Sequence, residues 1–111
     1  MSAHLKYRNR PTGGYASAKE ARRAADLKLL AKAGKIGALR EQVPYILIPS
    51  QVHPQTLAHQ ERACKYVADF VYEDALTGEQ IVEDAKGMRT PEYVIKRKLM
   101  LMVHGIVIRE V

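Results

Sequence analysis

Cysteine and long apolar runs are scarce in this sequence of 111 residues. The single cysteine, Cys64, excludes a disulfide within the chain, and its apolar neighbours favour a small core residue. No apolar run approaches the roughly 20 residues that span a bilayer, and residues 1–10 contain no apolar segment of signal-peptide type. We therefore expect a cytoplasmic protein with no membrane partner, and a length that suits one domain around a single core.

Acidic residues are scarce in the first 40 positions, and this asymmetry is more informative than the net charge of +6. The first 40 residues hold ten Lys or Arg and two acids, whereas the remaining residues hold eight bases and ten acids. A basic first third beside a more acidic remainder is typical of a polyanion binder with a cation site. It is equally typical of a solvated basic helix that keeps a protein soluble, so charge alone does not choose between the two interpretations.

The first 15 residues show no hydrophobic periodicity and include a Pro-Thr-Gly-Gly segment. We expect a flexible basic arm over residues 1–15 and a single folded domain over residues 16–111. Bases interleaved with tyrosines can follow a phosphate backbone, and the candidates here are Lys6, Arg8 and Arg10. An unstructured terminus without a role is an equally common alternative.

A helix is predicted to begin after Ser17, which has an N-cap side chain, and to end at Gly34. Glu20 stands in the capping-box position, which by itself explains an acid there. Glu20 also shares the apolar face of this helix, so its carboxylate is expected to face the sheet, and both interpretations can hold together. Arg22 and Arg23 lie mostly on the opposite side, where they are candidate nucleic-acid contacts.

A strand is predicted over residues 38–48, bent near Pro44, because a missing amide hydrogen favours an edge strand or a bulge. Gln42 in this strand is either an ordinary exposed position or an amide that orients water or phosphate near a site. Residues 50–60 are rich in glutamine and contain a proline, and we expect a mobile loop there. The two histidines of this loop lack a cysteine or carboxylate at partner spacing, so they are a weak metal signal.

Two further strands are predicted over residues 61–73 and 79–86, joined by a hairpin turn that contains a glycine. Pairing across this turn places Asp69 opposite Asp84, and opposed residues share a face of the sheet. Two carboxylates about 5 Å apart repel each other, and a divalent cation such as Mg²⁺ or Mn²⁺ removes that penalty. The sequence therefore predicts a cation site between these two strands.

The end of the second of these strands adds an ammonium to the carboxylates. Lys86 follows Asp84 by two residues, so in an extended strand both side chains project from the same face. Glu83 projects from the other face, which makes it a poorer candidate for the site than Asp84.

Thr90 and Pro91 have the residue types of an N-cap and a first helical position, and they predict a helix that Gly105 ends. A last short strand is predicted over residues 106–111, and the strand-helix-strand order implies a right-handed parallel crossover. The resulting order is αβββαβ. It defines an α/β fold with one mixed sheet flanked by helices.

The order of elements and the acids within it resemble the PD-(D/E)xK nuclease superfamily, which includes restriction endonucleases, archaeal Holliday-junction resolvases and the TnsA-type transposon endonuclease. More closely, the chain from Tyr15 onward resembles a family of small phage and prophage proteins of uncharacterised function in that superfamily. The segments that carry the resemblance are Ser17–Glu20, Glu41–Tyr45, Tyr66–Phe70 and Val82–Gly87. Ala68 stands where the superfamily has proline, a residue that supplies no metal ligand. The resemblance implies a restriction-endonuclease-like core.

The resemblance also assigns roles to individual residues. Asp69 and Asp84 match the two acids of the superfamily, Lys86 matches its lysine, and Glu20 matches the helical glutamate of the resolvase-like branches. Asp69, Asp84 and Glu20, with the carbonyl of Ala85, would then bind Mg²⁺ or Mn²⁺. Lys86 would position the attacking water or stabilise the charge that develops in the transition state.

These assignments imply a metal-dependent endonuclease that hydrolyses DNA phosphodiester bonds, with branched DNA in phage recombination, replication or packaging as the expected setting. A resolvase would act as a symmetric homodimer, and no organic cofactor is expected. The alternative is a non-catalytic nucleic-acid-binding module with a degenerate nuclease fold, in which the acids pair with Lys65 and Lys86. Further candidate contacts to nucleic acid are Gln42, Lys96 and Lys98, although a solvated helix face also explains the last two.

Overall fold

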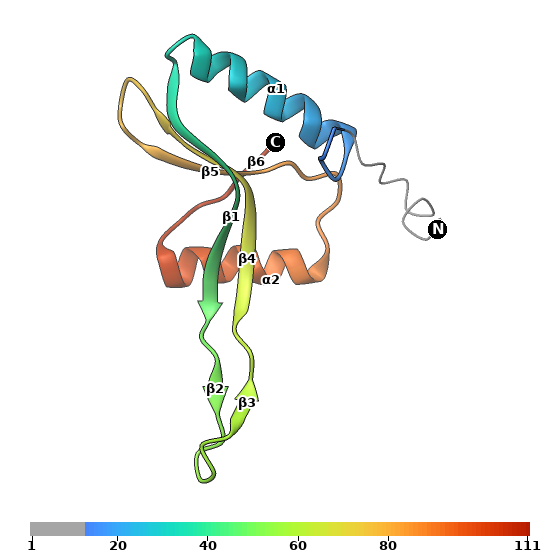
Figure 1. Cartoon of the computed structure of the whole chain (residues 1–111), viewed down its shortest axis with the longest axis vertical. Helices are drawn as coiled ribbons and strands as arrows, with labels where there is room; N and C mark the ends of the chain where they lie inside the picture. The colour runs from blue at the N-terminus through green and yellow to red at the C-terminus, as the bar shows by residue number, and fades with distance from the viewer. Residues whose placement is uncertain (1–12) are drawn as a thin grey trace.

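Two helices pack against a mixed sheet in the computed structural model, which describes residues 13–111 (Figure 1). The candidate arm residues Lys6, Arg8 and Arg10 lie outside the described residues. In chain order the elements are α1 (Ala18–Lys32), β1 (Ile36–Ile48), β2 (Gln51–Val52), β3 (His59–Glu61), β4 (Cys64–Asp74), β5 (Gln80–Asp84), α2 (Pro91–Leu99), the π-helical turn η2 (Met100–His104) and β6 (Arg109–Glu110).

The main sheet has the strand order β1-β4-β5-β6. Neighbouring strands from β1 to β5 are antiparallel, whereas β6 returns after α2 to run parallel to β5. β1 lies at an edge of this sheet, as Pro44 predicts. The predicted α/β class with a mixed sheet is therefore confirmed, and β2 with β3 adds a second, two-stranded sheet.

The register between β4 and β5 determines which acids meet. Phe70 pairs with Glu83, and the intervening turn contains Gly78 at φ 77°, in the left-handed region that glycine adopts without strain. This is the register predicted from the sequence. Continuing it by one residue places Asp69 opposite Asp84, at the end of β5.

Helix α1 begins where the sequence predicts, because the Ser17 hydroxyl accepts a hydrogen bond from the Glu20 amide over 3.1 Å. The helix ends before Gly34, whose φ of 76° closes it. Its buried residues are Glu20, Ala24 and Leu27, so the predicted inward face is confirmed. Glu20 is consequently held against the sheet by the same packing that buries its apolar neighbours.

The folded part of the chain includes Tyr15, which the sequence places in the basic arm. Tyr15 packs against the cluster of apolar residues under α1, and its hydroxyl accepts a hydrogen bond from Lys28 Nζ over 3.0 Å. The contact ties the segment before α1 to the third turn of the helix.

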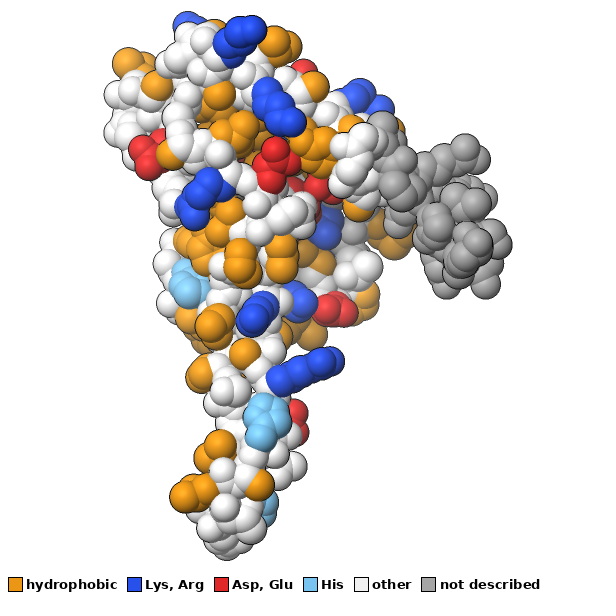
Figure 2. All heavy atoms as spheres, in the orientation of Figure 1, with side chains coloured by type: hydrophobic (Ala, Val, Ile, Leu, Met, Phe, Trp, Pro, Cys, Tyr) orange, Lys and Arg blue, Asp and Glu red, His pale blue; other side chains and the backbone are white. Residues whose placement is uncertain are grey.

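Two hydrophobic clusters fill the space between the sheet and the helices. Phe70 and Tyr72 of β4 belong to the cluster under α1, whereas Tyr66 and Ala68 belong to the cluster under α2. All four are even-numbered, so strict alternation would put them on one face of the sheet. The even-numbered residues of β4 therefore face α2 before Asp69 and α1 after it, so β4 changes sidedness at Asp69. Figure 2 shows further hydrophobic side chains exposed over the middle of the molecule, where β1 and β4 cross in front of α2 in Figure 1.

Residues 50–60 form the predicted loop only in their centre, over residues 53–58. They contribute to a β-hairpin of β2 and β3 that projects from the body of the molecule (Figure 1). Its tip is closed by two backbone hydrogen bonds, from the His53 amide to the Ala58 carbonyl over 2.8 Å and from the Leu57 amide to the His53 carbonyl over 2.9 Å. The loop prediction was wrong at both ends of this segment, where β2 pairs with β3, and a composition rich in glutamine does not reveal such pairing.

The second helix follows the prediction at both ends. Thr90 caps α2, Pro91 is its first residue, and the π-helical turn η2 extends it to Gly105 at φ 67°. Within residues 13–111, no helix is long and apolar enough to cross a membrane.

Candidate functional site

Asp69 and Asp84 come together where β4 and β5 meet. The Asp84 side chain is buried, and its Oδ2 atom accepts a hydrogen bond from the Tyr66 hydroxyl over 2.6 Å. Asp69 is half-buried, and its Oδ2 atom accepts a hydrogen bond from the Ala85 amide over 2.8 Å. Each acid is thus fixed by a donor from the strand or segment that carries the other.

Lys86 extends the carboxylate pair on the α2 side. Its Nζ atom lies 3.4 Å from Asp84 Oδ1 and 4.3 Å from the centre of the Tyr93 ring. The Lys86 ammonium is thus held between a carboxylate and an aromatic face. The Lys86 carbonyl accepts a hydrogen bond from Lys19 Nζ over 2.6 Å, which ties the start of α1 to the segment after β5.

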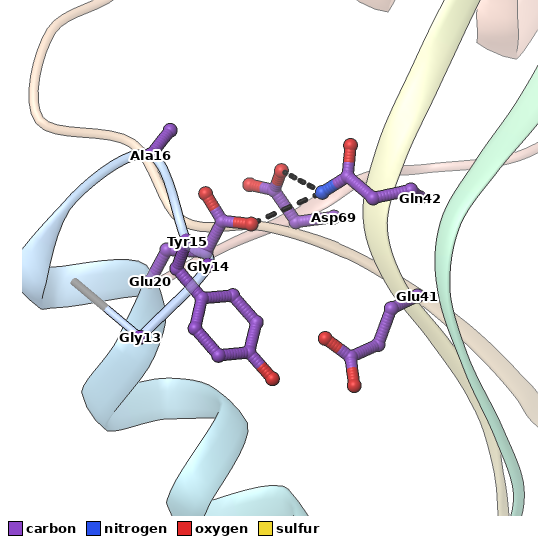
Figure 3. Close-up of a pocket in the computed structure, with 8 residues that line it drawn as sticks. All are labelled: Gly13, Gly14, Tyr15, Ala16, Glu20, Glu41, Gln42 and Asp69. Atoms are coloured by element: carbon purple, nitrogen blue, oxygen red, sulfur yellow. Dashed lines mark hydrogen bonds between the residues drawn. The ribbon is translucent and has the colours of Figure 1, made fainter. Parts of the chain in front are cut away.

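Glu20 reaches the same region from α1. Its Oε2 atom accepts a hydrogen bond from Gln42 Nε2 over 3.0 Å, and that nitrogen lies 3.5 Å from Asp69 Oδ1, at the limit of a hydrogen bond. Figure 3 shows the side chains of Glu20, Gln42 and Asp69 pointing toward one another across a pocket between α1, β1 and β4. Gln42 is exposed, as one interpretation of the sequence expects, and it also contacts the acids, as the other expects.

The backbone at Gln42 is unusual as well. Its φ of 53° lies in the left-handed region, which a residue with a side chain occupies at a cost of about 1 kcal/mol. Gln42 of β1 lies opposite Asp69, the residue at which β4 changes sidedness. The irregularity of both strands aims the amide of Gln42 at the two carboxylates.

The pKa values of two of the acids are raised by burial and by neighbouring negative charge. Burial raises the pKa of Asp69 to about 7, and the neighbouring charges of Asp84 and Glu20 add to this rise against the opposing hydrogen bond from the Ala85 amide. Burial also raises the pKa of Glu20, with a smaller contribution from Asp84. Burial and neighbouring negative charge therefore both favour the protonated forms of Asp69 and Glu20.

Glu83 lies in a separate network on the α1 side of the sheet, as the strand alternation predicts. It is fully buried and receives two hydrogen bonds from Arg23, over 2.8 Å from Nε and 2.6 Å from a terminal nitrogen. The Tyr72 hydroxyl also donates to Glu83, and Arg109 donates to that hydroxyl over 3.4 Å. Arg23, expected from the sequence to contact nucleic acid, is consequently paired with Glu83, and this pairing competes with a contact to phosphate.

The acids match a hard divalent cation in chemistry more closely than in spacing. Carboxylate oxygens are the ligands that Mg²⁺ and Mn²⁺ prefer. A cation would also offset the burial and the neighbouring negative charges that raise the pKa of Asp69. Within the described part of the chain, however, no three His, Cys, Asp or Glu side chains have the close spacing of a metal site. Glu20 is joined to Asp69 through the amide of Gln42 instead. Of the acids described, Asp69 and Asp84 are the two whose strands bring them together and which could hold a cation between them.

The remaining basic candidates lie on exposed surface or in ion pairs. Arg22 and Lys98 are exposed, and Lys96 Nζ lies 3.0 Å from Glu92 Oε2 on the preceding turn of α2. The sequence missed the contribution of Tyr66, because alternation along β4 places it on the face away from Asp69. No local signal pointed to this residue.

The geometry defines an α/β protein with a half-buried cluster of carboxylates beside a lysine, at the junction of its two central strands and first helix. The chain belongs to a protein family of unknown function, DUF1064, whose model matches residues 11–107. No significant match was found among curated proteins or among solved structures.

Proposed function

We propose that the chain is a metal-dependent endonuclease that hydrolyses DNA phosphodiester bonds and has a restriction-endonuclease-like core of the PD-(D/E)xK type. The observation that carries this proposal is the convergence of Asp69, Asp84 and Lys86, with the pKa of Asp69 raised by burial and by its neighbours. A structural core gains nothing from carboxylates that repel each other. A site that binds a cation and a phosphate needs that arrangement.

Each residue has a distinct part in the proposed reaction. Asp69 and Asp84 would hold the cation. Glu20 would be a further acid near it, connected to Asp69 through the side-chain amide of Gln42. Bound Mg²⁺ or Mn²⁺ supplies Lewis-acid polarisation of the phosphate and a lower pKa for the attacking water. The Lys86 ammonium lies beside Asp84, where it can orient water or neutralise the charge that develops on the phosphate oxygens. Tyr66 fixes the rotamer of Asp84 through its hydroxyl.

The test is cleavage of supercoiled plasmid and of a four-way DNA junction by the purified protein in Mg²⁺ or Mn²⁺. We expect Asp69→Asn, Asp84→Asn and Lys86→Met each to lower the rate by at least about 100-fold, because each removes a charge used in the transition state. The matched control is Asp26→Asn, which changes an exposed acid on α1 away from the cluster and should cut at the rate of the wild type. Cleavage by the Asp69 and Asp84 variants at the wild-type rate would refute the site.

A non-catalytic nucleic-acid-binding module is the second candidate. It is favoured by the hydrogen bonds that the acids already accept within the protein. Glu20, Asp69 and Asp84 each accept a hydrogen bond from a protein donor, and Asp84 also pairs with Lys86. In this function the cluster would be a structural polar network. Wild-type protein that binds DNA but cuts no supercoiled, junction or single-stranded substrate in either metal would establish it.

A further inference from the structure

A groove leads away from the carboxylates between β4 and the first turns of α2. The pairing of β5 with β4 ends at Phe70, so the β4 residues before it border the groove instead of a neighbouring strand on that side. The groove has a volume of about 1070 Å³, at or above the upper end of the roughly 300–1,000 Å³ typical of small-molecule sites. Its size therefore suits a segment of a chain molecule.

The groove carries lysines along its sides and carboxylates at its deep end. Tyr66 and Tyr93, with ring centres 6.4 Å apart, form its floor. Lys65 stands on the β4 rim and Lys96 on the α2 rim. The acids Asp84, Asp69 and Glu20 line its deep end, where they are buried or half-buried. Ammonium groups thus flank the approach to a carboxylate cluster.

We propose that this groove binds the phosphate backbone of a DNA strand, with Lys65 and Lys96 contacting phosphates on its two rims. The proposal rests on the proposed function, because it assumes that the bond to be cut lies over Asp69 and Asp84. A polyanionic strand then has its neighbouring phosphates at the lysine rims, where each ammonium replaces a counterion. On the α1 side, Arg23 is paired with Glu83, and Lys19, which also lines the groove, donates a hydrogen bond to the Lys86 carbonyl.

Glu92 allows a test in the opposite direction, because it is an acid in the same groove. Its carboxylate lines the same groove, is 77% exposed and pairs with Lys96 over 3.0 Å. Bound phosphate would compete with Glu92 for the Lys96 ammonium and would be repelled by its charge. Removing the Glu92 charge should therefore strengthen binding, while removing either lysine should weaken it.

The experiment is titration of the full chain with fluorescent DNA oligonucleotides, followed by anisotropy in EDTA so that the probe is not cut, over a range of salt concentrations. We expect Lys65→Gln and Lys96→Gln each to weaken binding about fivefold and to reduce the salt slope by about 1. We expect Glu92→Gln to tighten binding about twofold. The matched control is Lys32→Gln, in the last turn of α1, exposed and outside the groove lining, which should change affinity less than either groove variant.

The outcomes separate this proposal from the proposed function. If the two groove variants bind like Lys32→Gln, or if Glu92→Gln weakens binding, the DNA strand does not lie in the groove, even if the wild type cuts DNA. If the groove variants lose affinity and Glu92→Gln gains it while the wild type fails to cut in any metal, the groove proposal holds and the nuclease proposal fails. Circular dichroism spectra matching the wild type establish that each variant is folded.

Discussion

At the scale of single residues, the environment of Asp69 determines both stability and chemistry. Burial and two neighbouring carboxylates keep the pKa of this side chain near 7, far above its ordinary value of 3.8. The carboxyl therefore binds its proton more tightly in the folded chain than in the unfolded chain. Its contribution to stability is full below about pH 4 and is lost as the pH rises through 7.

Replacing Asp69 with asparagine should therefore stabilise the protein at high pH. Asparagine keeps an oxygen that accepts the Ala85 amide hydrogen but carries no charge to be repelled. We expect Asp69→Asn in EDTA to raise the free energy of unfolding by about 1–3 kcal/mol at pH 8 and to leave it nearly unchanged at pH 4. Urea denaturation at the two pH values measures the difference. An equal effect at both values would contradict the account.

Asp74 supplies the matched control with the opposite sign. Hydrogen bonds from the amides of Thr77 and Leu76 lower the pKa of its carboxyl below the ordinary value. That stabilisation is present above the unfolded pKa and is lost as the pH falls through the folded pKa. Asp74→Asn should therefore reduce stability at pH 8 and have a smaller effect near pH 3, the reverse of Asp69→Asn.

At the scale of elements, the ion pair between α1 and β5 holds the parts of the site in place. Arg23 lies one helical turn after Glu20, and Glu83 directly precedes Asp84. The paired hydrogen bonds between Arg23 and Glu83 therefore fix the helix that carries one acid to the strand that carries another. A helical projection of the sequence placed Arg23 outward. Its long side chain nevertheless reaches back to a carboxylate 60 residues away along the chain.

Removing Arg23 should cost more stability than removing its neighbour. Arg23→Met leaves the fully buried Glu83 without its cation, and we expect a loss of about 3 kcal/mol in the free energy of unfolding. Arg22→Met, on the exposed side of the same helix, should stay within about 0.5 kcal/mol of the wild type. The double variant Arg23→Met with Glu83→Met should recover part of the loss, because no unpaired charge remains. Equal losses for Arg22→Met and Arg23→Met in urea denaturation would show that the pair has no structural role.

The hairpin of β2 and β3 should be dispensable for the fold. All of its strand residues are exposed, and it projects from the body of the molecule (Figure 1). Ile48 and Cys64 face each other at its base, so an Asn-Gly turn can replace residues 49–63. We expect the melting temperature to change by no more than about 4 °C. A fall well beyond that in thermal denaturation would mean that the hairpin stabilises the sheet.

At the scale of the whole molecule, local patterns predicted most of the fold. The caps at Ser17 and Thr90 and the glycine turn before β5 were predicted correctly, because each depends on a few neighbouring residues. The pairing of Asp69 with Asp84 followed from the turn, since turn position fixes register. The mixed sheet then followed from the order of its elements.

Features that depend on distant contacts were missed. Alternation could not reveal that β4 changes sidedness at Asp69, which is what brings Tyr66 to Asp84. Nor could composition show the pairing of β2 with β3, or the reach of Arg23 to Glu83. The contacts of Tyr66 and Arg23 are made across the fold and leave no periodic pattern in the sequence. The pairing of β2 with β3 is local, but strands of two and three residues are too short to show an alternating pattern.

The central claim is that Asp69 and Asp84 together bind a divalent cation, and anomalous diffraction from crystals soaked in MnCl₂ tests it most directly. The account predicts an anomalous peak within about 2.0–2.6 Å of an oxygen of each carboxylate in the wild type. The peak should be absent from Asp84→Asn crystals treated identically. A wild-type protein that cuts DNA in Mn²⁺ and shows no anomalous peak between Asp69 and Asp84 would contradict the account.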